Sequence, residues 1–357
     1  MKEIEKKLRR IVNKLSYKLL YSLLAISSFM FLLTIYGKDV LKEIEVGDIA
    51  AWVRTIENLA SPMLHFFDYV IVKILVWIAF AIILILLVCK AILRPKGIVI
   101  NHSTFSNTQS SFDESIGKGL LISQRDLNLV DLMKRQDVVE AVRTQDRLVN
   151  SILRDCDEYT ELFYYGIAHI PLIFRAGFQI GDEGKVRLLH KYRNEQAAFK
   201  EISTEADDFK IELTGNAHCF NKAAKEMLVV VATSFPVSSA DLEVFRNNEI
   251  GYELRFEMNS QSFYGVDSVV SYAVMNRLRT GILNHIRKIV ASDNIEKIHL
   301  VLSTSSDFTF FLSQGFSKYH DPEIIVYQYE RSNPQKYPWG ISNKALPATS
   351  FIRQNKA

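Results

Sequence analysis

Cysteine is scarce in this sequence. Only three occur among 357 residues, Cys89, Cys156 and Cys219, and they are isolated from one another. No pair has the C-x-x-C spacing of a metal or redox site, and there is no framework of paired cysteines. Such cysteine usage is typical of a reducing compartment. The sequence therefore predicts neither a disulfide scaffold nor a cysteine-ligated centre, and we expect no metal.

Signature motifs of common enzymes are also missing. The sequence contains no H-E-x-x-H zinc motif and no G-x-S-x-G nucleophile motif. The segment Ile116–Gly119 contains a Gly-Lys-Gly, but it lacks the upstream glycine and the following Ser or Thr of a P-loop, so we interpret it as a turn. We expect a protein that is not an enzyme and uses no cofactor. A catalytic site assembled from distant positions stays open, so the alternative is a membrane-tethered enzyme acting on a nucleotide signal.

Charge of one sign is not in large excess. The formal net charge is +3, and the first eighteen residues alone hold seven lysines and arginines against Glu3 and Glu5. The rest of the chain is therefore close to neutral. This balance has no signature of duplex nucleic-acid binding, and we expect none.

Two long apolar runs lie near the N-terminus. Residues 19–36 contain no charge, and residues 70–93 are interrupted only by Lys73 and Lys90. A helix needs about 20 apolar residues to cross a bilayer. No A-x-A-like cleavage site follows the first run, which disfavours a signal peptide. The pattern predicts two transmembrane helices, about 19–36 and 70–93, that form a hairpin with a short extracytoplasmic loop.

The placement of lysine and arginine predicts the orientation of this hairpin. Seven precede the first run and three follow the second, whereas the loop between the runs holds three together with several acidic residues. By the positive-inside rule, both termini face the cytoplasm. Arg94-Pro95-Lys96-Gly97 ends the second helix, because proline cannot continue it. We therefore expect a membrane unit over 1–96, a cytoplasmic domain over 97–340 and a C-terminal tail over 341–357.

The cytoplasmic part alternates strand-like and helix-like segments. The predicted strands are 98–100, 161–166, 170–174, 185–191, 209–213, 227–232, 252–258, 297–302 and 323–329. The predicted helices are 126–155, 221–226, 240–246, 266–291 and 308–314. The turn-rich segment after Arg331 is predicted to be peripheral. This alternation favours an α/β domain with an open, largely parallel sheet.

Three strands run into loops of small polar residues, at 101–106, 232–239 and 303–307. Ligands of doubly wound sheets collect at the carboxyl ends of strands, and backbone N–H groups and helix N-termini there suit phosphate. Each loop alone also fits a plain turn or helix cap, but the recurrence favours a ligand site. The candidate ligand-binding residues in these loops are His102, Ser103, Thr233, Ser234, Phe235, Ser303, Ser305, Ser306 and Asp307.

Further candidates lie outside these loops. His169 follows a strand-like segment and precedes Pro171, so it is either a packed histidine or a phosphate contact. Arg193 is either a surface residue or a bidentate phosphate ligand. Tyr327 and Tyr329 alternate on the last predicted strand, where either core packing or stacking on a base fits.

The C-terminal third resembles SAVED domains, the ligand-sensing modules of CBASS anti-phage systems. The features that carry the resemblance are, in chain order, Lys297–Leu302, Ser303–Asp307, Phe308–Gly315 and Ile324–Tyr329. The segments around Gly166–Pro171 and Arg193 are similar to the earlier half of such domains. SAVED loops after the late strand often hold a proline where this chain has Thr304 or Ser305.

With two apolar runs in front, the chain is similar to two-transmembrane SAVED effectors. The resemblance implies two fused CARF-like Rossmannoid halves over roughly 98–340. It implies a cyclic di- or trinucleotide ligand made by a cognate nucleotidyltransferase (CD-NTase), and a homo-oligomer that forms on ligand binding. For a multi-pass effector of the bacterial inner membrane, it implies bilayer disruption and abortive infection. A scaffold that docks a partner through the 126–155 helix is a third hypothesis.

Overall fold

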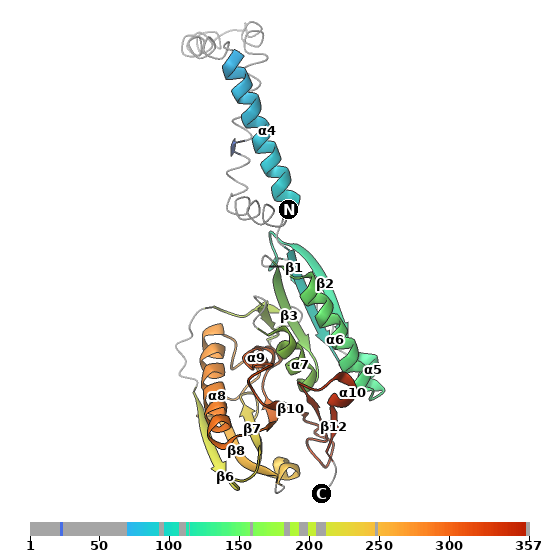
Figure 1. Cartoon of the computed structure of the whole chain (residues 1–357), viewed down its shortest axis with the longest axis vertical. Helices are drawn as coiled ribbons and strands as arrows, with labels where there is room; N and C mark the ends of the chain where they lie inside the picture. The colour runs from blue at the N-terminus through green and yellow to red at the C-terminus, as the bar shows by residue number, and fades with distance from the viewer. Residues whose placement is uncertain are drawn as a thin grey trace. The chain divides into compact units, whose positions relative to one another are not determined.

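The computed structural model describes residues 22–23, 70–92, 96–106, 112–113, 115–157, 160–181, 186–192, 199–204, 212–246 and 249–354 (Figure 1). The chain divides into two compact units, residues 1–94 and 95–357. The predicted first span, 19–36, lies outside the described residues apart from 22–23.

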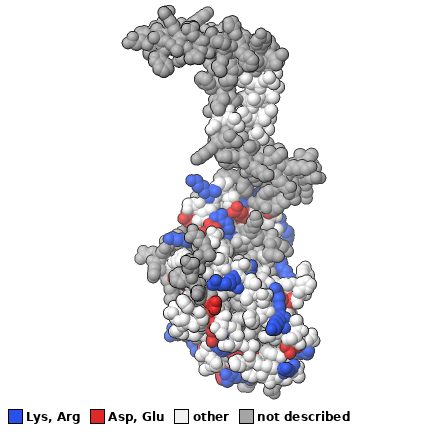
Figure 2. Space-filling view, turned by 90° about the vertical axis from the view of Figure 1, so that its left-hand side faces the viewer, with Lys and Arg blue, Asp and Glu red and all other residues white. Residues whose placement is uncertain are grey.

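The described element of the first unit is the helix α4 (Val70–Ile92), which coincides with the second apolar run. Its side chains are described over residues 74–88, and they form a surface without Lys, Arg, Asp or Glu (Figure 2). Among the residues that the structure describes, no helix combines the length and the apolar character needed to cross a membrane.

The second unit contains two sheets. The first has the order β2-β1-β3-β4-β5 and consists of β1 (Lys96–Ser103), β2 (Leu121–Asn128), β3 (Glu161–Ile167), β4 (Val186–His190) and β5 (Lys200–Glu201). Its first four strands are parallel, and β5 is antiparallel to β4. The strands β1, β3 and β4 lie side by side as a buried parallel sheet, as their apolar sequences indicate.

The second sheet has the order β12-β11-β10-β9-β7-β8-β6. Its strands are β6 (Leu213–Cys219), β7 (Glu226–Ala232), β8 (Ile250–Met258), β9 (Lys297–Ser303), β10 (Glu323–Gln328), β11 (Trp339–Ser342) and β12 (Phe351–Arg353). The central strands β10, β9, β7 and β8 are parallel, and β6, β11 and β12 add antiparallel edges. Each half thus has a parallel centre, which confirms the predicted α/β architecture.

Helices join the two sheets into one core. They are α5 (Val130–Lys134), α6 (Val138–Asp155), α7 (Ile170–Ile180), α8 (Tyr272–Asp293), α9 (Ser306–Ser313) and α10 (Pro347–Ser350), with 3₁₀ turns η1 (Ala240–Phe245) and η2 (Gln261–Phe263). One continuous apolar cluster contains Tyr164 of the first sheet, Val229 of the second and the buried faces of α7, α8 and α9. The short helix η1 packs on the opposite face of the second sheet.

The helices α7 and α9 approach each other closely because of a glycine. A Cβ atom at Gly177 would lie 2.1 Å from Ser313 Oγ and 2.6 Å from the Phe310 carbonyl oxygen. Only glycine allows this backbone contact, so Gly177 fixes the distance between a helix of the first half and a helix of the second.

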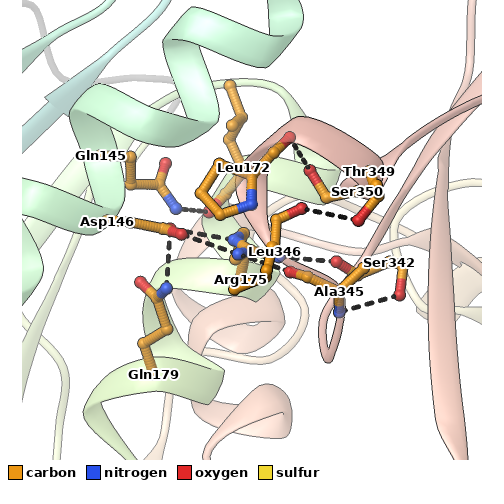
Figure 3. A network of polar contacts seen from close by, with 11 residues as sticks. Gln145, Asp146, Leu172, Arg175, Gln179, Ser342, Ala345, Leu346, Thr349 and Ser350 are labelled. Atoms are coloured by element: carbon orange, nitrogen blue, oxygen red, sulfur yellow. Dashed lines mark hydrogen bonds and ion pairs between the residues drawn. The ribbon is translucent and has the colours of Figure 1, made fainter.

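A buried ion pair fastens the C-terminal segment to the first half (Figure 3). The Arg175 guanidinium, 3% exposed, donates to both carboxylate oxygens of Asp146 at 2.9 and 2.7 Å. It also donates to the carbonyl oxygens of Ser342 (2.6 Å) and Ala345 (3.1 Å). Gln179 donates to Asp146 at 2.7 Å. The predicted peripheral location of the segment after Arg331 is therefore wrong, since this segment supplies two strands of the sheet and buried contacts.

Two predicted elements differ in type. The segment 170–174, predicted as a strand, belongs to the helix α7, because His169 adopts an extended N-cap conformation and Pro171 fits the first helical turn. The predicted helix 126–155 is the end of β2 followed by α5 and α6. Gln136, with a φ of 58°, breaks the helical path between α5 and α6. The short helix predicted at 221–226 is a turn that leads into β7.

Candidate functional site

A cleft of about 810 Å³ opens at the carboxyl ends of the parallel strands of both sheets. Its walls are formed by residues at the ends of β3, β4, β7, β9 and β10 and by the loops that follow them. Ligand pockets of proteins commonly measure about 300–1,000 Å³, so this cleft has the size of a ligand site.

The cleft lies where the strand order of the second sheet reverses. The chain passes from β7 to β8 on one side, whereas β9 lies on the other side of β7. Open α/β sheets bind ligands at such a reversal of strand order, outside the carboxyl ends of the strands. The sequence prediction of a site at the strand ends is thus matched by the position of this cleft.

Backbone hydrogen bonds hold these two loops together. The N–H groups of Thr233 and Ser234 donate to the Ser303 carbonyl oxygen at 2.9 and 2.8 Å. The N–H group of Phe235 donates to the Ser303 hydroxyl at 3.2 Å. Ser305 caps α9 by accepting from the Phe308 N–H group at 3.4 Å. Together with the N-terminus of α9, the loops after β7 and β9 form the floor of the cleft.

Aromatic and basic side chains line the same cleft. Phe235 is 54% exposed and Tyr329 is 42% exposed, although both are large aromatic residues. Lys191 follows β4 and Arg331 follows β10, and both line the cleft. Two aromatic faces and two cations are the groups that bind the bases and phosphates of a nucleotide.

A charged cluster lies at the boundary between the two halves. His190 at the end of β4 lies between two carboxylates: its Nδ1 is 3.1 Å from Asp307 Oδ1, and its Nε2 is 2.9 Å from Asp267 Oδ1. Burial alone would lower the pKa of His190, but the hydrogen bonds and negative charges of Asp307 and Asp267 outweigh it and raise the pKa above its usual value. His190 and Asp307 both line the cleft.

Six of the predicted site residues line this cleft: Ser234, Phe235, Ser303, Ser305, Ser306 and Asp307. Thr233 lies directly beneath them and is buried. Arg193 lies outside the described residues. His102, Ser103 and His169 are not part of the cleft lining, and they come together elsewhere.

His102 and Ser103 end β1, and His169 is the N-cap of α7, after β3. The Thr104 hydroxyl contacts the His169 N–H group at 3.0 Å and His169 Nδ1 at 2.7 Å, and the Phe105 ring stacks on His169 at 4.5 Å. The Ser103 carbonyl oxygen accepts from the Leu129 N–H group. His169 is thus held by contacts with Thr104 and Phe105.

His102 and His169 are neutral because of burial. Burial, assisted by the nearby His169, lowers the pKa of His102 to about 3, and its Nδ1 lies 3.0 Å from the Tyr164 hydroxyl. Burial lowers the pKa of His169 to about 4, although the charge of Glu330 acts in the opposite direction. In these two positions the packed-histidine interpretation agrees with the structure.

Sequence reasoning missed several cleft residues. His190 ends β4, Lys191 and Tyr192 follow it, and Arg331 and Tyr337 follow β10. Tyr329 was considered for base stacking, and it lines the cleft, whereas Tyr327 is buried and contacts His299 at 2.8 Å. The signal for His190, Lys191 and Tyr192 was the polar segment at the end of a predicted strand. The same signal identified the loops after β7 and β9.

In the described part of the chain, no group of three or more His, Cys, Asp or Glu side chains is placed to hold a metal ion.

The fold and the cleft define an α/β ligand-binding domain. Residues 145–342 match the SAVED family, described as the SMODS-associated and fused to various effectors sensor domain. This match covers more than half of the chain, and the chain belongs to the SAVED family. The resemblance inferred from the sequence is confirmed for the sensor domain. The matched region starts within α6, so β1 and β2 precede it.

Several solved structures are similar to this chain. Two are structures of the Acinetobacter baumannii Cap4 SAVED/CARF-domain containing receptor, with the cyclic trinucleotides 3′3′3′-cAAA and 2′3′3′-cAAA. Both are 11% identical, with TM-scores of 0.49 and 0.48, and the matches cover 90% and 87% of this chain. They cover 66% and 64% of the receptor, so the chain spans less than two thirds of its length.

A third similar structure is that of the Moraxella osloensis Cap4 SAVED/CARF-domain containing receptor. It is 11% identical, with a TM-score of 0.40, and the match covers 93% of this chain and 83% of that one. No curated protein sequence matches the chain.

Proposed function

We propose that this chain is a membrane-anchored sensor of anti-phage defence that binds a cyclic oligonucleotide in the cleft between its two halves. The observation that carries the proposal is the composition of the cleft at the strand-order reversal of the second sheet. Exposed aromatic faces lie there beside cations and a helix N-terminus. Membership of the SAVED family supports the role of a sensor.

The parts of the cleft correspond to the parts of such a ligand. Phe235 and Tyr329 offer faces on which bases stack, an interaction worth about 1–3 kcal/mol per base. Lys191 and Arg331 supply positive charge for phosphates. Ser303, the last residue of β9, is part of the floor of the cleft. A cyclic oligonucleotide carries several bases and phosphates on one ring, so it can engage these groups together.

Calorimetric titration of the full chain in detergent with cyclic di-AMP, cyclic di-GMP and cyclic tri-AMP tests the proposal. We expect one of them to bind, and F235A and Y329A each to raise its Kd by about 5- to 150-fold, as the loss of one base stack implies. Y319A is the matched control, because Tyr319 is 89% exposed on the loop after α9 and does not line the cleft. Binding that F235A and Y329A leave unchanged would place the ligand elsewhere.

The same samples test the enzyme alternative. We propose that the ligand is bound and not consumed, as the role of a sensor implies. After incubation with the full chain, chromatography should return the cyclic nucleotide intact. Accumulation of a linear product would favour the membrane-tethered enzyme instead.

We also propose that the first unit anchors the chain in the bacterial inner membrane. The described side chains of α4 include eight large apolar residues that are 46–59% exposed, from Ile74 to Val88. Removing apolar surface from water is favourable by about 25 cal/mol per Å², so a hydrocarbon environment suits this helix better than water. The lysine and arginine distribution in the sequence favours cytoplasmic termini.

A charge in the middle of α4 tests the anchor. I82K should reduce the fraction of full chain that stays in the membrane pellet after alkaline extraction, because a lysine at mid-bilayer costs about 2.5–3.5 kcal/mol. T280K on the exposed side of α8 is the control for an added lysine. Release of the wild-type chain into the supernatant would contradict the membrane location.

A further inference from the structure

His190 joins the two halves of the sensor unit beside the cleft. It ends β4 of the first sheet, whereas Asp267 and Asp307 belong to the second half, and its side chain is 3% exposed. Both ring nitrogens lie within hydrogen-bond distance of a carboxylate oxygen, at 2.9 and 3.1 Å. Ionised carboxylates only accept hydrogen bonds, so a carboxylate on each side of the ring favours a proton on both nitrogens, the imidazolium form.

Asp307 lies in the first turn of α9, the position where a phosphate would bind. Ser305 is the N-cap of this eight-residue helix, and Asp307 follows two residues later. A helix N-terminus attracts anions through its free N–H groups and its dipole. A carboxylate in the same turn opposes a second anion unless a cation neutralises it. In this structure that cation is His190.

A second observation points to a ligand at this terminus. The Ser234 hydroxyl, in a residue that is 4% exposed, has no hydrogen-bond partner among the described residues, and Ser234 lines the same cleft. The second oxygen of Asp307, Oδ2, is likewise buried and unpartnered in the described part of the chain. Buried polar atoms of native proteins nearly always have partners. A phosphate of a ligand in the cleft would accept a hydrogen bond from the Ser234 hydroxyl.

We propose that His190 is a positioning residue whose imidazolium neutralises Asp307 and thereby lets the N-terminus of α9 accept a phosphate of the ligand. Removal of the imidazolium leaves the Asp307 carboxylate uncompensated, and its charge then repels the phosphate. This inference rests on the proposed function, since it concerns the same ligand in the same cleft.

The test compares H190Q, D307N and the double variant H190Q/D307N in the full chain. The probe is whichever of cyclic di-AMP, cyclic di-GMP and cyclic tri-AMP binds the wild-type chain most tightly. At 50 mM salt, we expect H190Q to raise Kd by about tenfold or more, because a carboxylate within several ångströms of an anion repels it. D307N should keep the wild-type Kd or lower it, and the double variant should recover to within about threefold. H320Q is the control, since His320 is exposed and lies outside the cleft lining.

Salt dependence separates electrostatics from a loss of structure. At 1 M salt the screening length in solvent falls to about 3 Å, and because buried charges are screened less than exposed ones, the H190Q defect should shrink without disappearing. A defect of the same size at both salt concentrations, or equal losses in H190Q, D307N and the double variant, would overturn the inference. If H190Q fails to fold, D307N still decides, because weakened binding in D307N contradicts the inference. A wild-type chain that binds none of the three nucleotides refutes the proposed function itself.

Discussion

The buried histidines of the first half make the sensor unit sensitive to acid. His102 and His169 have pKa values of about 3 and about 4 in the folded chain, against an ordinary value of about 6.5 in the unfolded chain. Between pH 6.5 and pH 4 the unfolded chain therefore binds more protons than the folded chain. Stability falls as the pH is lowered through this window.

Replacing one of these histidines should reduce this slope. Each group lowers the free energy of unfolding by up to about 1.4 kcal/mol per pH unit below pH 6.5. We expect urea unfolding of H169Q, followed by near-ultraviolet circular dichroism, to lose less stability between pH 6 and pH 5 than the wild-type chain does. H320Q serves as the exposed control. A wild-type slope retained in H169Q would show that His169 takes up a proton in the folded state.

We expect loss of the ion pair of Arg175 and Asp146 to lower the free energy of unfolding more than replacement of a buried histidine changes it. R175M leaves Asp146 as a buried carboxylate without a counter-charge and removes the donors to the Ser342 and Ala345 carbonyl oxygens. Breaking such a pair from one side costs about 3–5 kcal/mol. R143M, on α6 like Asp146, should cost less than about 1 kcal/mol, because the Arg143–Glu140 pair is partly exposed. Comparing the urea midpoints of the two variants measures the difference.

At the scale of elements, the contact between α7 and α9 links stability to the cleft. In G177A the added methyl group would overlap Ser313 and Phe310, so α9 has to move. Because Asp307 lies on α9, we expect both a loss of stability of about 1–3 kcal/mol and weaker binding of the cyclic nucleotide. G281A is the matched control. Nothing lies within 4 Å of a Cβ at Gly281 in α8, so alanine should stabilise by about 0.5–1 kcal/mol. Unchanged binding in a destabilised G177A would separate the helix contact from the site.

Elements with a strong local pattern could be predicted from the sequence, and the others could not. β7 and β9 are short apolar runs, and α8 has apolar residues at helical spacing, so their signals are local. The segment 170–174 is also a short apolar run, and periodicity alone cannot distinguish a buried strand from a buried helix. Its helical state depends on the cap at His169 and on packing against α9. β11 is buried only because it pairs with β10, a contact that no local pattern records.

The same distinction applies to the site. The loops after β7 and β9 were found because small polar residues follow apolar strands along the chain. His190 pairs with Asp307, a partner 117 positions away, so its role depends on how the two halves meet. His102 and His169 carried the same local signal as the cleft residues, but they contact Tyr164, Thr104 and Phe105 and do not line the cleft. Whether a strand-end loop is open or filled is decided by tertiary packing.

At the scale of the whole molecule, we propose that ligand binding drives assembly of chains in the membrane. A ligand does this only if it binds the assembled state better than the single chain. We expect sedimentation velocity of the full chain in detergent to show a larger species when the bound cyclic nucleotide is present. F235A, which should lose the ligand, should stay at the size of the ligand-free chain. A ligand that binds without changing the sedimentation coefficient would end the assembly mechanism.

The cleft has two unlike walls. Ends of β3 and β4 form one of them, and the loops after β7, β9 and β10 form the other, with His190 on the first and Phe235 on the second. A ring built from two identical nucleotides is symmetric, but its halves would meet different chemistry in this cleft. A ring with two different bases would instead prefer one of its two orientations in the cleft. If the proposed cyclic nucleotide binds in this cleft, the two unlike walls favour one orientation of a ring that carries two different bases.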